Sequence, residues 1–301
     1  VYNGEKVVKR AIDSVINQTY KDIELIVVND GSNDGTKNII DESARRDNRI
    51  YAIHKENAGV SNARNTGIDI SSGKYIMFID SDDQYELDMV EKMLNKIEEN
   101  SYDLVCCGFK NIVYNSNDKI IKVTNSKKLN IDYKNRNDLL QRIDSFMGTW
   151  LFNPLWNKIY RADVIRDNKI KMDESSDMGE DYCFNIDYIS RCNTVCVFDE
   201  TLYKYTLSKE CLTTKFRVNE FERRKPNLVK LENFYDSNNI SKNRLYFEYI
   251  MMSYSCFSHL FRKENKNTRK ENLGYIASII NSESVTNSLR EFNSSSFGEV
   301  I

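Results

Sequence analysis

The chain has 301 residues, enough for one large domain or two smaller ones, and its hydrophobic (40%) and charged (29%) fractions are those of an ordinary globular protein. The formal net charge of −2 excludes a global field that would recruit nucleic acid or acidic lipid. Seven scattered cysteines without a Cys-x-x-Cys pair, and only two histidines, argue against a zinc site and for reduced thiols in a cytoplasm.

The first hundred residues alternate between helical and extended patterns. The spacing of apolar residues predicts helices over 4–18, from about 36, over 59–70 and over 87–100, and strands over 23–28, 51–54, 74–79 and 103–114. Asn3 is predicted to cap the first helix. Strands separated by helices predict parallel β-α-β units, in which ligands bind beyond the carboxyl ends of the strands.

The pattern changes in the second half of the chain. A helix is predicted over 136–146 and another from Asp181, with a strand over 194–199, and apolar stripes over 219–237 and 244–262 predict C-terminal helices before a basic stretch at 262–270. The longest apolar run, 246–261, contains Glu248, His259 and several serines and is too short and polar to span a bilayer. At the other end, the chain opens on Val1 without an initiator Met, and we expect a first strand to precede this sequence.

Three carboxylates follow the apolar strand at 76–79, in the run Asp80-Ser81-Asp82-Asp83. Like charges at one strand end repel one another, and a divalent cation would remove that cost. Alternation along an extended chain puts Asp80 and Asp82 on one side, and hard oxygen ligands suit Mg²⁺ or Mn²⁺. The alternative interpretation is a solvated Asp-rich turn.

A second carboxylate, Asp30, ends the strand at 23–28 and precedes Gly31. A carboxylate there can accept a hydrogen bond from a base imide or a ribose hydroxyl, and the glycine permits close approach. The alternative is an ordinary strand–turn–helix joint. In the next segment, Asn57 precedes a helix of small residues on which Arg64 is a fixed cation that faces a nucleotide, pairs with the Asp cluster, or is a surface arginine.

Further along, Gly179 is followed by Glu180 and Asp181, which open an amphipathic helix. The helix dipole alone favours acids at that place, and the functional alternative is a general base for an acceptor hydroxyl. In the segment at 153–160, Trp156 is a candidate for stacking on a sugar ring, with a core tryptophan as the alternative. Lys158 is a candidate for a phosphate contact or for holding the segment at 180–181.

Taken in order, these segments resemble glycosyltransferase family 2, the inverting nucleotide-sugar transferases of GT-A fold, over roughly residues 1–207. The matching pieces are Tyr2-Asn3, Asn29-Asp30-Gly31-Ser32, Asn57-x-Gly59-x-Ser61-x-Ala63-Arg64, Asp80-Ser81-Asp82-Asp83, Trp156-Asn157-Lys158 and Gly179-Glu180-Asp181. The family's opening strand and its usual proline are absent from this sequence. The resemblance implies an α/β GT-A fold with a mostly parallel, Rossmann-like sheet flanked by helices, in a catalytic domain over 1–207 followed by a C-terminal helical region over 208–301.

The resemblance also implies roles for single residues. Tyr2 and Asp30 would hold the nucleotide base, helped by Asn57 and Arg64. Within the acidic run, Asp80 would contact the ribose or the metal, Ser81 would lie against the nucleotide sugar, and Asp82 would ligate Mn²⁺ or Mg²⁺. Asp181 would be the general base, with Glu180 beside it, and Trp156 and Lys158 would lie on the acceptor side.

The function implied is metal-dependent transfer of a sugar, with inversion, from a UDP-sugar to a hydroxyl of a glycan, polymer or lipid-linked acceptor in bacterial cell-surface polysaccharide synthesis. Two alternatives are a sugar-1-phosphate nucleotidyltransferase and a non-catalytic domain that binds a sugar nucleotide. The expected location is the cytoplasm, with peripheral contact to the inner face of the membrane, or homodimer formation, through the C-terminal helices.

Overall fold

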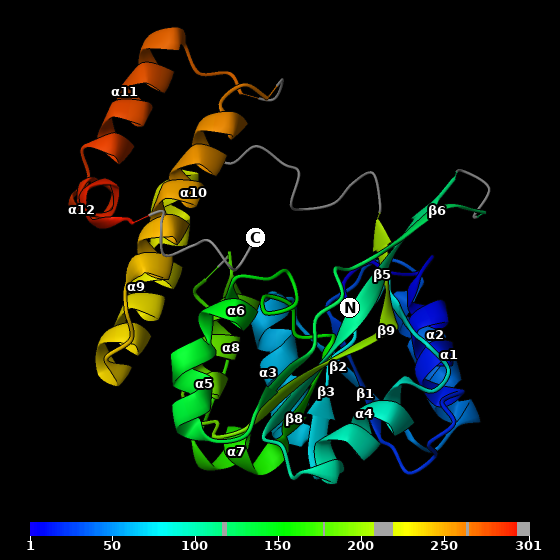
Figure 1. Ribbon diagram of the computed structural model, residues 1–301. Coiled ribbons are helices and arrows are strands. Elements are labelled where there is room, and N and C mark those ends of the chain that lie inside the picture. Colours follow the sequence, from blue (N-terminus) through cyan, green and yellow to red (C-terminus); the bar gives the residue numbers. More distant parts are fainter. Residues whose placement is uncertain (116–118, 177, 208–218, 263–264, 294–301) are drawn as a thin grey trace.

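The computed structural model describes the chain except for residues 116–118, 177, 208–218, 263–264 and 294–301 (Figure 1). Its strands are β1 (Leu25–Asp30), β2 (Ile50–Lys55), β3 (Tyr75–Met77), β4 (Gln84–Tyr85), β5 (Leu104–Tyr114), β6 (Ile120–Asn125), β7 (Ile131–Tyr133), β8 (Lys158–Arg161) and β9 (Val195–Leu207). Its helices are α1 (Val8–Ile16), α2 (Thr36–Arg46), α3 (Val60–Ile70), α4 (Met89–Glu99), α5 (Arg136–Arg142), α6 (Asp144–Met147), α7 (Ala162–Asp167), α8 (Glu180–Ile189), α9 (Glu220–Asn238), α10 (Asn243–His259), α11 (Arg269–Ile280) and α12 (Glu283–Glu291).

The strands form two sheets. β1 and β2 pair in parallel, and the larger sheet has the order β3-β8-β5-β9-β4, with β6 added to β5 and β7 added to β9. β5 and β9 are parallel, whereas β8 lies antiparallel between β3 and β5. β3 and β5 therefore run in the same direction, as a β-α-β unit requires. The larger sheet is nevertheless mixed rather than mostly parallel, because β8 is inserted between them and β4, β6 and β7 also pair antiparallel.

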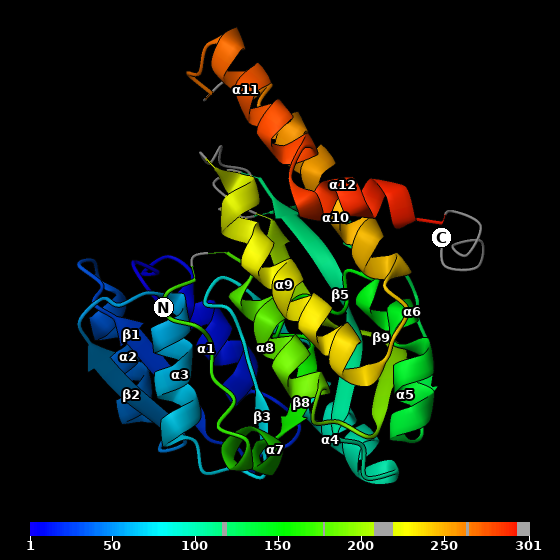
Figure 2. The same cartoon turned by 90° about the vertical axis from the view of Figure 1, so that its left-hand side faces the viewer.

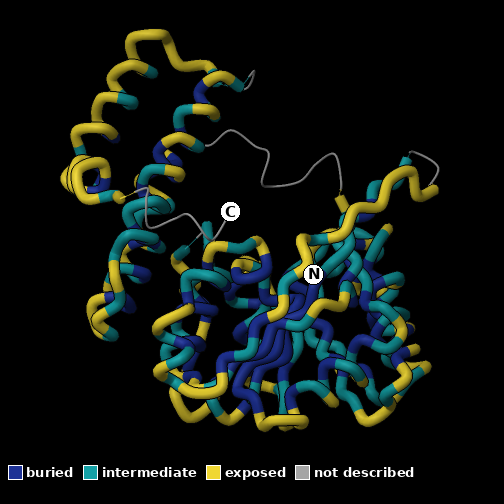
Figure 3. The backbone as a smooth tube through the Cα atoms, viewed as in Figure 1, coloured by how far each residue is buried: buried dark blue, intermediate teal, exposed yellow. Residues whose placement is uncertain are grey.

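The hydrophobic core has two parts, one on each face of the larger sheet. Alternate residues of β5 point to opposite faces, so Leu104 and Cys106 join one part while Val105 and Cys107 join the other. The buried strands run through the centre of the molecule (Figure 3). The six described cysteines are free thiols, five of them buried, and Cys211 lies outside the described residues.

The helices that follow the sheet share one of these core parts. Leu228 and Phe234 of α9 and Tyr249 of α10 belong to the same cluster as Phe184 and Tyr188 of α8. In Figure 2, α9 crosses in front of α8, and the two helices are in contact. α11 is much less embedded and buries only Ile279. The domain boundary expected at 207/208 adjoins residues 208–218, which lie outside the described residues. Positions 263–264 of the predicted basic stretch also lie outside them.

The first helix begins later than predicted and is not capped by Asn3. α1 starts at Val8 after an N-cap at Val7 without a side-chain hydrogen bond. Asn3 instead has a positive φ of 48° and accepts a hydrogen bond from the N–H of Asn33 at 2.9 Å. The side chain that looked like a cap thus ties the start of the chain to the turn between β1 and α2. The amino group of Val1 also ties the start of the chain to β1, because it donates to the carbonyl of Val28 at 2.7 Å.

Candidate active site

The acidic run Asp80–Asp83 forms the turn between β3 and β4. The N–H of Asp83 donates to the carbonyl of Asp80 at 3.1 Å, and the Asp80 side chain is 35% exposed. Burial and the negative charge of Asp80 raise the pKa of Asp82. Asp80 and Asp82 thus present two carboxylates that repel each other, which is the arrangement that a cation relieves.

Asp83 faces the interior. Its carboxylate accepts from the hydroxyl of Tyr203 at 2.7 Å and from the N–H of Thr206 at 2.6 Å. The same tyrosine hydroxyl accepts a hydrogen bond from the N–H of Asp80 at 3.2 Å. Burial, with the charges of Asp80 and Asp82, raises the pKa of Asp83 to about 8. Asp83 therefore anchors the turn to β9.

Arg64 on α3 gathers three carboxylates that come from two distant segments. Its Nη2 donates to Asp80 at 2.9 Å, and its Nη1 donates to Asp181 at 2.5 Å and to Glu180 at 3.2 Å. Burial alone would lower the pKa of Arg64, but the three carboxylates raise it above its usual value. The guanidinium is thus a permanent cation between the acidic turn and the start of α8. The structure shows that Arg64 pairs with the acids, and its contact with a nucleotide stays a prediction.

Asp181 lies in the first turn of α8, where the helix dipole favours a negative charge. Burial raises its pKa, the charge of Arg64 opposes that rise, and the neighbouring charges of Glu180 and Asp80 add to it. A carboxylate with a raised pKa is a stronger base than an ordinary aspartate, which suits proton abstraction from a hydroxyl near neutral pH.

Asp30 holds the loop between β2 and α3. Its carboxylate accepts from Lys55 Nζ at 2.7 Å. It also accepts from the backbone N–H groups of Ala58 and Gly59 at 3.0 and 2.9 Å. Burial would raise the pKa of Asp30, but the hydrogen bonds from these three donors outweigh it, so the pKa is lowered and the group is ionised. The side chain of Asn57 donates to the Asp30 carbonyl at 2.8 Å, which closes the loop over the end of β1.

The remaining predicted nucleotide contacts lie at the surface around this loop and the acidic turn. Tyr2 is 53% exposed. Ser81 is half-buried, and its hydroxyl lies 3.9 Å from where a Cβ on Gly4 would be, which places it beside the start of the chain. Base binding by Tyr2, Asp30 and Asn57 and a donor contact by Ser81 stay predictions.

Trp156 and Lys158 do not lie on an acceptor surface, and that prediction was wrong. Trp156 is 6% exposed and stacks on Tyr203 with 4.1 Å between ring centroids. Lys158 is fully buried, and its Nζ donates to the carbonyls of Leu151 and Pro154 at 2.7 and 2.5 Å. Burial lowers the pKa of Lys158 to about 8. The Trp156 side chain packs in the core, and the Lys158 side chain hydrogen-bonds inside the protein.

Two residues near the acidic turn were not singled out from the sequence. Tyr203 joins Asp80 to Asp83, and Arg10 donates from Nη2 to the carbonyl of Asp82 at 2.9 Å. Arg10 lies on the surface of a helix and Tyr203 in a long strand, so neither has a local pattern that marks it. Only the long-range contact identifies them.

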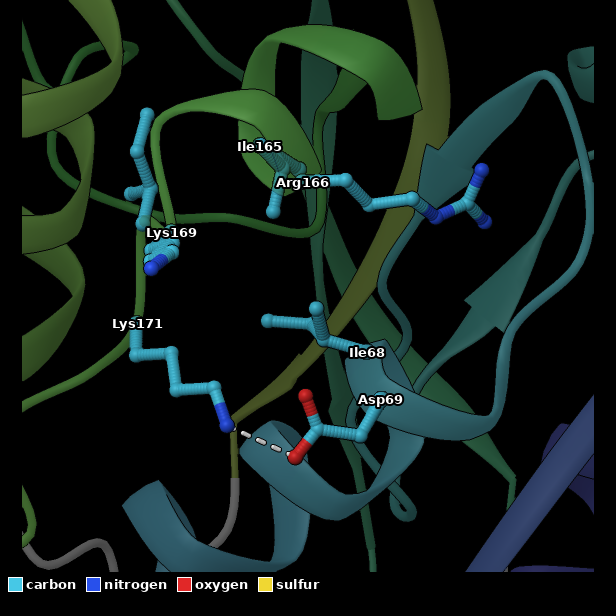
Figure 4. Close-up of a pocket in the computed structure, with 7 residues that line it drawn as sticks. Ile68, Asp69, Ile165, Arg166, Lys169 and Lys171 are labelled. Carbon is cyan, nitrogen blue, oxygen red and sulfur yellow. Dashed lines mark hydrogen bonds and ion pairs between the residues drawn. The ribbon is translucent and has the colours of Figure 1, made fainter.

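The pocket shown in Figure 4 is separate from this cluster. It has a volume of about 520 Å³ and lies between the end of α3 and α7. Its lining residues are Ile68, Asp69, Ile165, Arg166, Lys169, Ile170 and Lys171, and none of them is a predicted site residue. Lys171 and Asp69 form an ion pair of 2.7 Å across its mouth (Figure 4).

The profile of glycosyl transferase family 2 matches residues 1–167, more than half of the chain. The chain belongs to glycosyltransferase family 2. This confirms the resemblance seen in the ordered motifs. The matched region contains Arg64 and the acidic turn and ends before Glu180 and Asp181.

Bacterial relatives of this family 2 member extend the similarity beyond residue 167. The uncharacterized glycosyltransferase EpsJ of Bacillus subtilis (strain 168) is 33% identical over 213 residues, which cover 71% of this chain and 61% of EpsJ. Glycosyltransferase GlyA of Streptococcus pneumoniae serotype 4 is 32% identical over 214 residues, which cover 71% of this chain and 30% of GlyA. The chain thus spans less than two thirds of the length of either relative.

Solved structures show the same fold at lower identity. S. aureus TarS 1–349 in complex with UDP-GlcNAc superimposes with a TM-score of 0.69 and 20% identity, over 93% of this chain and 79% of that one. The mannosyltransferase PcManGT from Pyrobaculum calidifontis, in complex with GDP-Man and Mn²⁺, gives a TM-score of 0.58 and 13% identity, over 95% and 80% of the two chains. These similarities confirm the predicted GT-A fold class.

Proposed function

We propose that this chain transfers a sugar from a UDP-activated donor to a hydroxyl of a glycan, polymer or lipid-linked acceptor, with inversion, in cell-surface polysaccharide synthesis. The observation that carries the proposal is the position of Arg64, which brings Asp80 and Asp181 together from two distant segments. The resemblance assigns the first of these acids to the donor and its metal and the second to the acceptor. One small site would thus serve both substrates. The TarS complexes with UDP and UDP-GlcNAc support a UDP-linked donor.

Asp80 and Asp82 fit a divalent cation. They are hard oxygen ligands, they repel each other, and the Asp82 carboxyl is partly desolvated. Within the part of the chain that the structure describes, no three or more His, Cys, Asp or Glu side chains gather as a metal-binding group. Protein ligands from this turn would therefore leave room for diphosphate oxygens and water, as is usual for Mg²⁺. A bound Mn²⁺ or Mg²⁺ would neutralise the departing nucleoside diphosphate.

Asp181 would take the proton of the acceptor hydroxyl onto its carboxylate. Arg64 opposes the rise that burial causes in the pKa of that carboxylate, and its short, partly buried ion pair fixes the carboxylate before the acceptor arrives. A single displacement at the anomeric carbon inverts its configuration, whereas retaining glycoside hydrolases use a second carboxylate as nucleophile. The role of Glu180 is to share Arg64 and to orient the first turn of α8.

Release of UDP from a panel of UDP-sugars, with and without chelator, tests the proposal. We expect turnover and UDP binding that both require Mn²⁺ or Mg²⁺, and UDP binding that ignores chelator would remove the metal role of Asp82. Asp181→Asn is expected to abolish transfer while UDP still binds, and Glu180→Gln, which loses a carboxylate at the same guanidinium, should lose less. Retained turnover in Asp181→Asn would place the base elsewhere.

The same assays separate the two alternative functions. A nucleotidyltransferase would release pyrophosphate from UTP and a sugar 1-phosphate. A non-catalytic binding domain would bind UDP-sugar without releasing UDP at any enzyme concentration. The gathered carboxylates favour catalysis over the non-catalytic alternative, because a binding module has no use for a base beside the donor site.

We also propose that the C-terminal helices contact an anionic lipid surface at the inner face of the cell membrane. Arg269 and Lys270 open α11, and the exposed Leu273 and Ile280 follow at helical spacing on the same side. Phe261 is 85% exposed at the end of α10. None of the described helices is long and apolar enough to cross a membrane. Sedimentation with phosphatidylglycerol vesicles tests this, and the charge-reversed control Arg269→Glu/Lys270→Glu should bind the vesicles less. A dimer detected without vesicles would favour the homodimer instead.

A further inference from the structure

Asn227 of α9 holds the start of the helix that carries Asp181. Its Nδ2 donates to the carbonyl of Met178 at 3.0 Å, just before α8. Its Oδ1 accepts from the thiol of Cys183 at 3.2 Å, one half-turn after Asp181. The two hydrogen bonds of one amide side chain therefore bracket Glu180 and Asp181 on both sides.

The backbone at Gly179 is shaped to receive this amide. Gly179 has a φ of +79°, and a Cβ built on it would lie 2.0 Å from Nδ2 of Asn227. No side chain with a Cβ fits there while Asn227 keeps its place, and glycine also adopts the left-handed conformation without cost. The turn that precedes the two acids is thus in direct contact with α9.

The start of α8 has little else to fix it. Among the described residues, no side chain caps its N-terminus, since the N-cap position is Gly179 itself. Ser, Thr, Asp and Asn are the side chains preferred for this purpose. Arg64 contacts the carboxylates of the two acids and not their backbone. The Ser176 hydroxyl also donates to the carbonyl of Met178, at 3.2 Å, so Asn227 is the contact that holds this backbone from another helix.

We propose that Asn227 is a positioning residue for Asp181, through which the C-terminal helical region sets the geometry of the base. The inference rests on the proposed function, in which Asp181 accepts the proton of the acceptor hydroxyl. It goes beyond the region of the family match, because α9 begins at residue 220 and the match ends at 167. The C-terminal helices would then be needed for turnover as well as for stability.

Asn227→Ala and Asn227→Asp test the proposal against a matched variant, Lys230→Met. Lys230 lies on the same helix and pairs with Asp187 in the second half of α8 at 2.5 Å, so its loss weakens the same helix pair away from the acids. Asn227→Asp keeps an oxygen for Cys183 and loses the donor to Met178. Both Asn227 variants should lower kcat by at least about tenfold, since a small misplacement of a base is costly, with donor KM and Mn²⁺–UDP affinity nearly unchanged.

Hydrogen exchange measured by mass spectrometry gives a readout that needs no turnover. Asn227→Ala should speed exchange in the peptide that covers 179–184, and Lys230→Met should speed it in the peptide that covers 186–190 while kcat stays near wild type. Wild-type kcat in Asn227→Ala, unchanged exchange over 179–184, or an equal loss of kcat in Lys230→Met would each overturn the inference. Failure of the proposed function is seen differently, as UDP release by Asp181→Asn at the wild-type rate.

Discussion

The guanidinium of Arg64 on α3 donates to the carboxylate of Asp181 on α8 at 2.5 Å. The same guanidinium also binds Asp80 in the turn after β3. Three carboxylates therefore depend on one cation, and none of them is fully exposed. The arrangement couples the acidic turn to the start of α8, because a change at Arg64 reaches both.

Replacing Arg64 with Met should destabilise the fold by about 3 kcal/mol, because it leaves partly buried carboxylates without their partner. Urea unfolding at neutral pH measures the loss, and Arg45→Met on the exposed side of α2 is the control. The loss should shrink as the pH is lowered and Asp181, whose pKa is raised by burial, takes up a proton. A variant as stable as the control at neutral pH would mean that water solvates the three carboxylates well enough without the guanidinium.

Lys158 gives a prediction for the pH dependence of stability. Its pKa is lowered by burial from 10.5 to about 8, so between these pH values the unfolded chain holds a proton that the folded chain has released. The free energy of unfolding should therefore rise with pH in this window, by about 1.4 kcal/mol per unit for one proton, relative to a chain without this lysine. Below about pH 8 both states are protonated, and this contribution to the slope vanishes.

Urea unfolding of wild type and Lys158→Met at several pH values from 7 to 10.5 measures this slope. The difference between the two proteins isolates Lys158 from the tyrosines and cysteines that titrate in the same range. Lys37→Met, at an exposed position, is the control and should run parallel to wild type. Parallel curves for Lys158→Met would show that the buried amine keeps its proton.

Apart from the two-residue β4, the order of helices and strands up to residue 114 could be predicted from the sequence, as could the acids of the candidate site, because both depend on local patterns. Periodic apolar residues mark α3 and β5, and the carboxylates stand at recognisable strand and helix ends. Pairing between strands is not local: β8 is only four residues long with a charged residue at each end, and only its contacts with Tyr75–Met77 and Leu104–Cys106 reveal that it is a strand and which way it runs.

Burial was equally hard to predict where one pattern fits two environments. An aromatic residue beside polar residues describes both a sugar platform and a core tryptophan, and Trp156 is the second. Asn227 and Tyr203 hydrogen-bond to residues 49 and 120 positions away in the chain, so no local spacing in the sequence indicates these contacts. The sequence therefore identifies groups that could do chemistry better than it identifies the residues that hold them.

Trp156 and Trp150, the two tryptophans of the chain, form a natural pair for testing the corrected assignment. Trp156→Ala should destabilise the fold by about 3–5 kcal/mol, because it opens a cavity beside Tyr203 and Phe109. Trp150 is 82% exposed, so Trp150→Ala should change stability by less than about 0.5 kcal/mol. Chemical unfolding measures both, and a Trp156 variant of near wild-type stability with a raised acceptor KM would restore its role at the acceptor.

Gly179 and Gly274 should respond to alanine in opposite directions. Gly179→Ala combines a left-handed φ of +79° with a Cβ 2.0 Å from Asn227, so we expect a loss of at least about 1–2 kcal/mol from the backbone alone and a fall in turnover. Gly274 lies inside α11 with nothing within 4 Å of the methyl group that alanine would add, and Gly274→Ala should stabilise by about 0.5–1 kcal/mol. Thermal and urea unfolding measure both changes.

Adding Asn227→Ala to Gly179→Ala removes the clash and leaves the cost of the left-handed φ. The double variant should therefore recover part of the lost stability. Strictly additive losses would mean that the two residues do not touch.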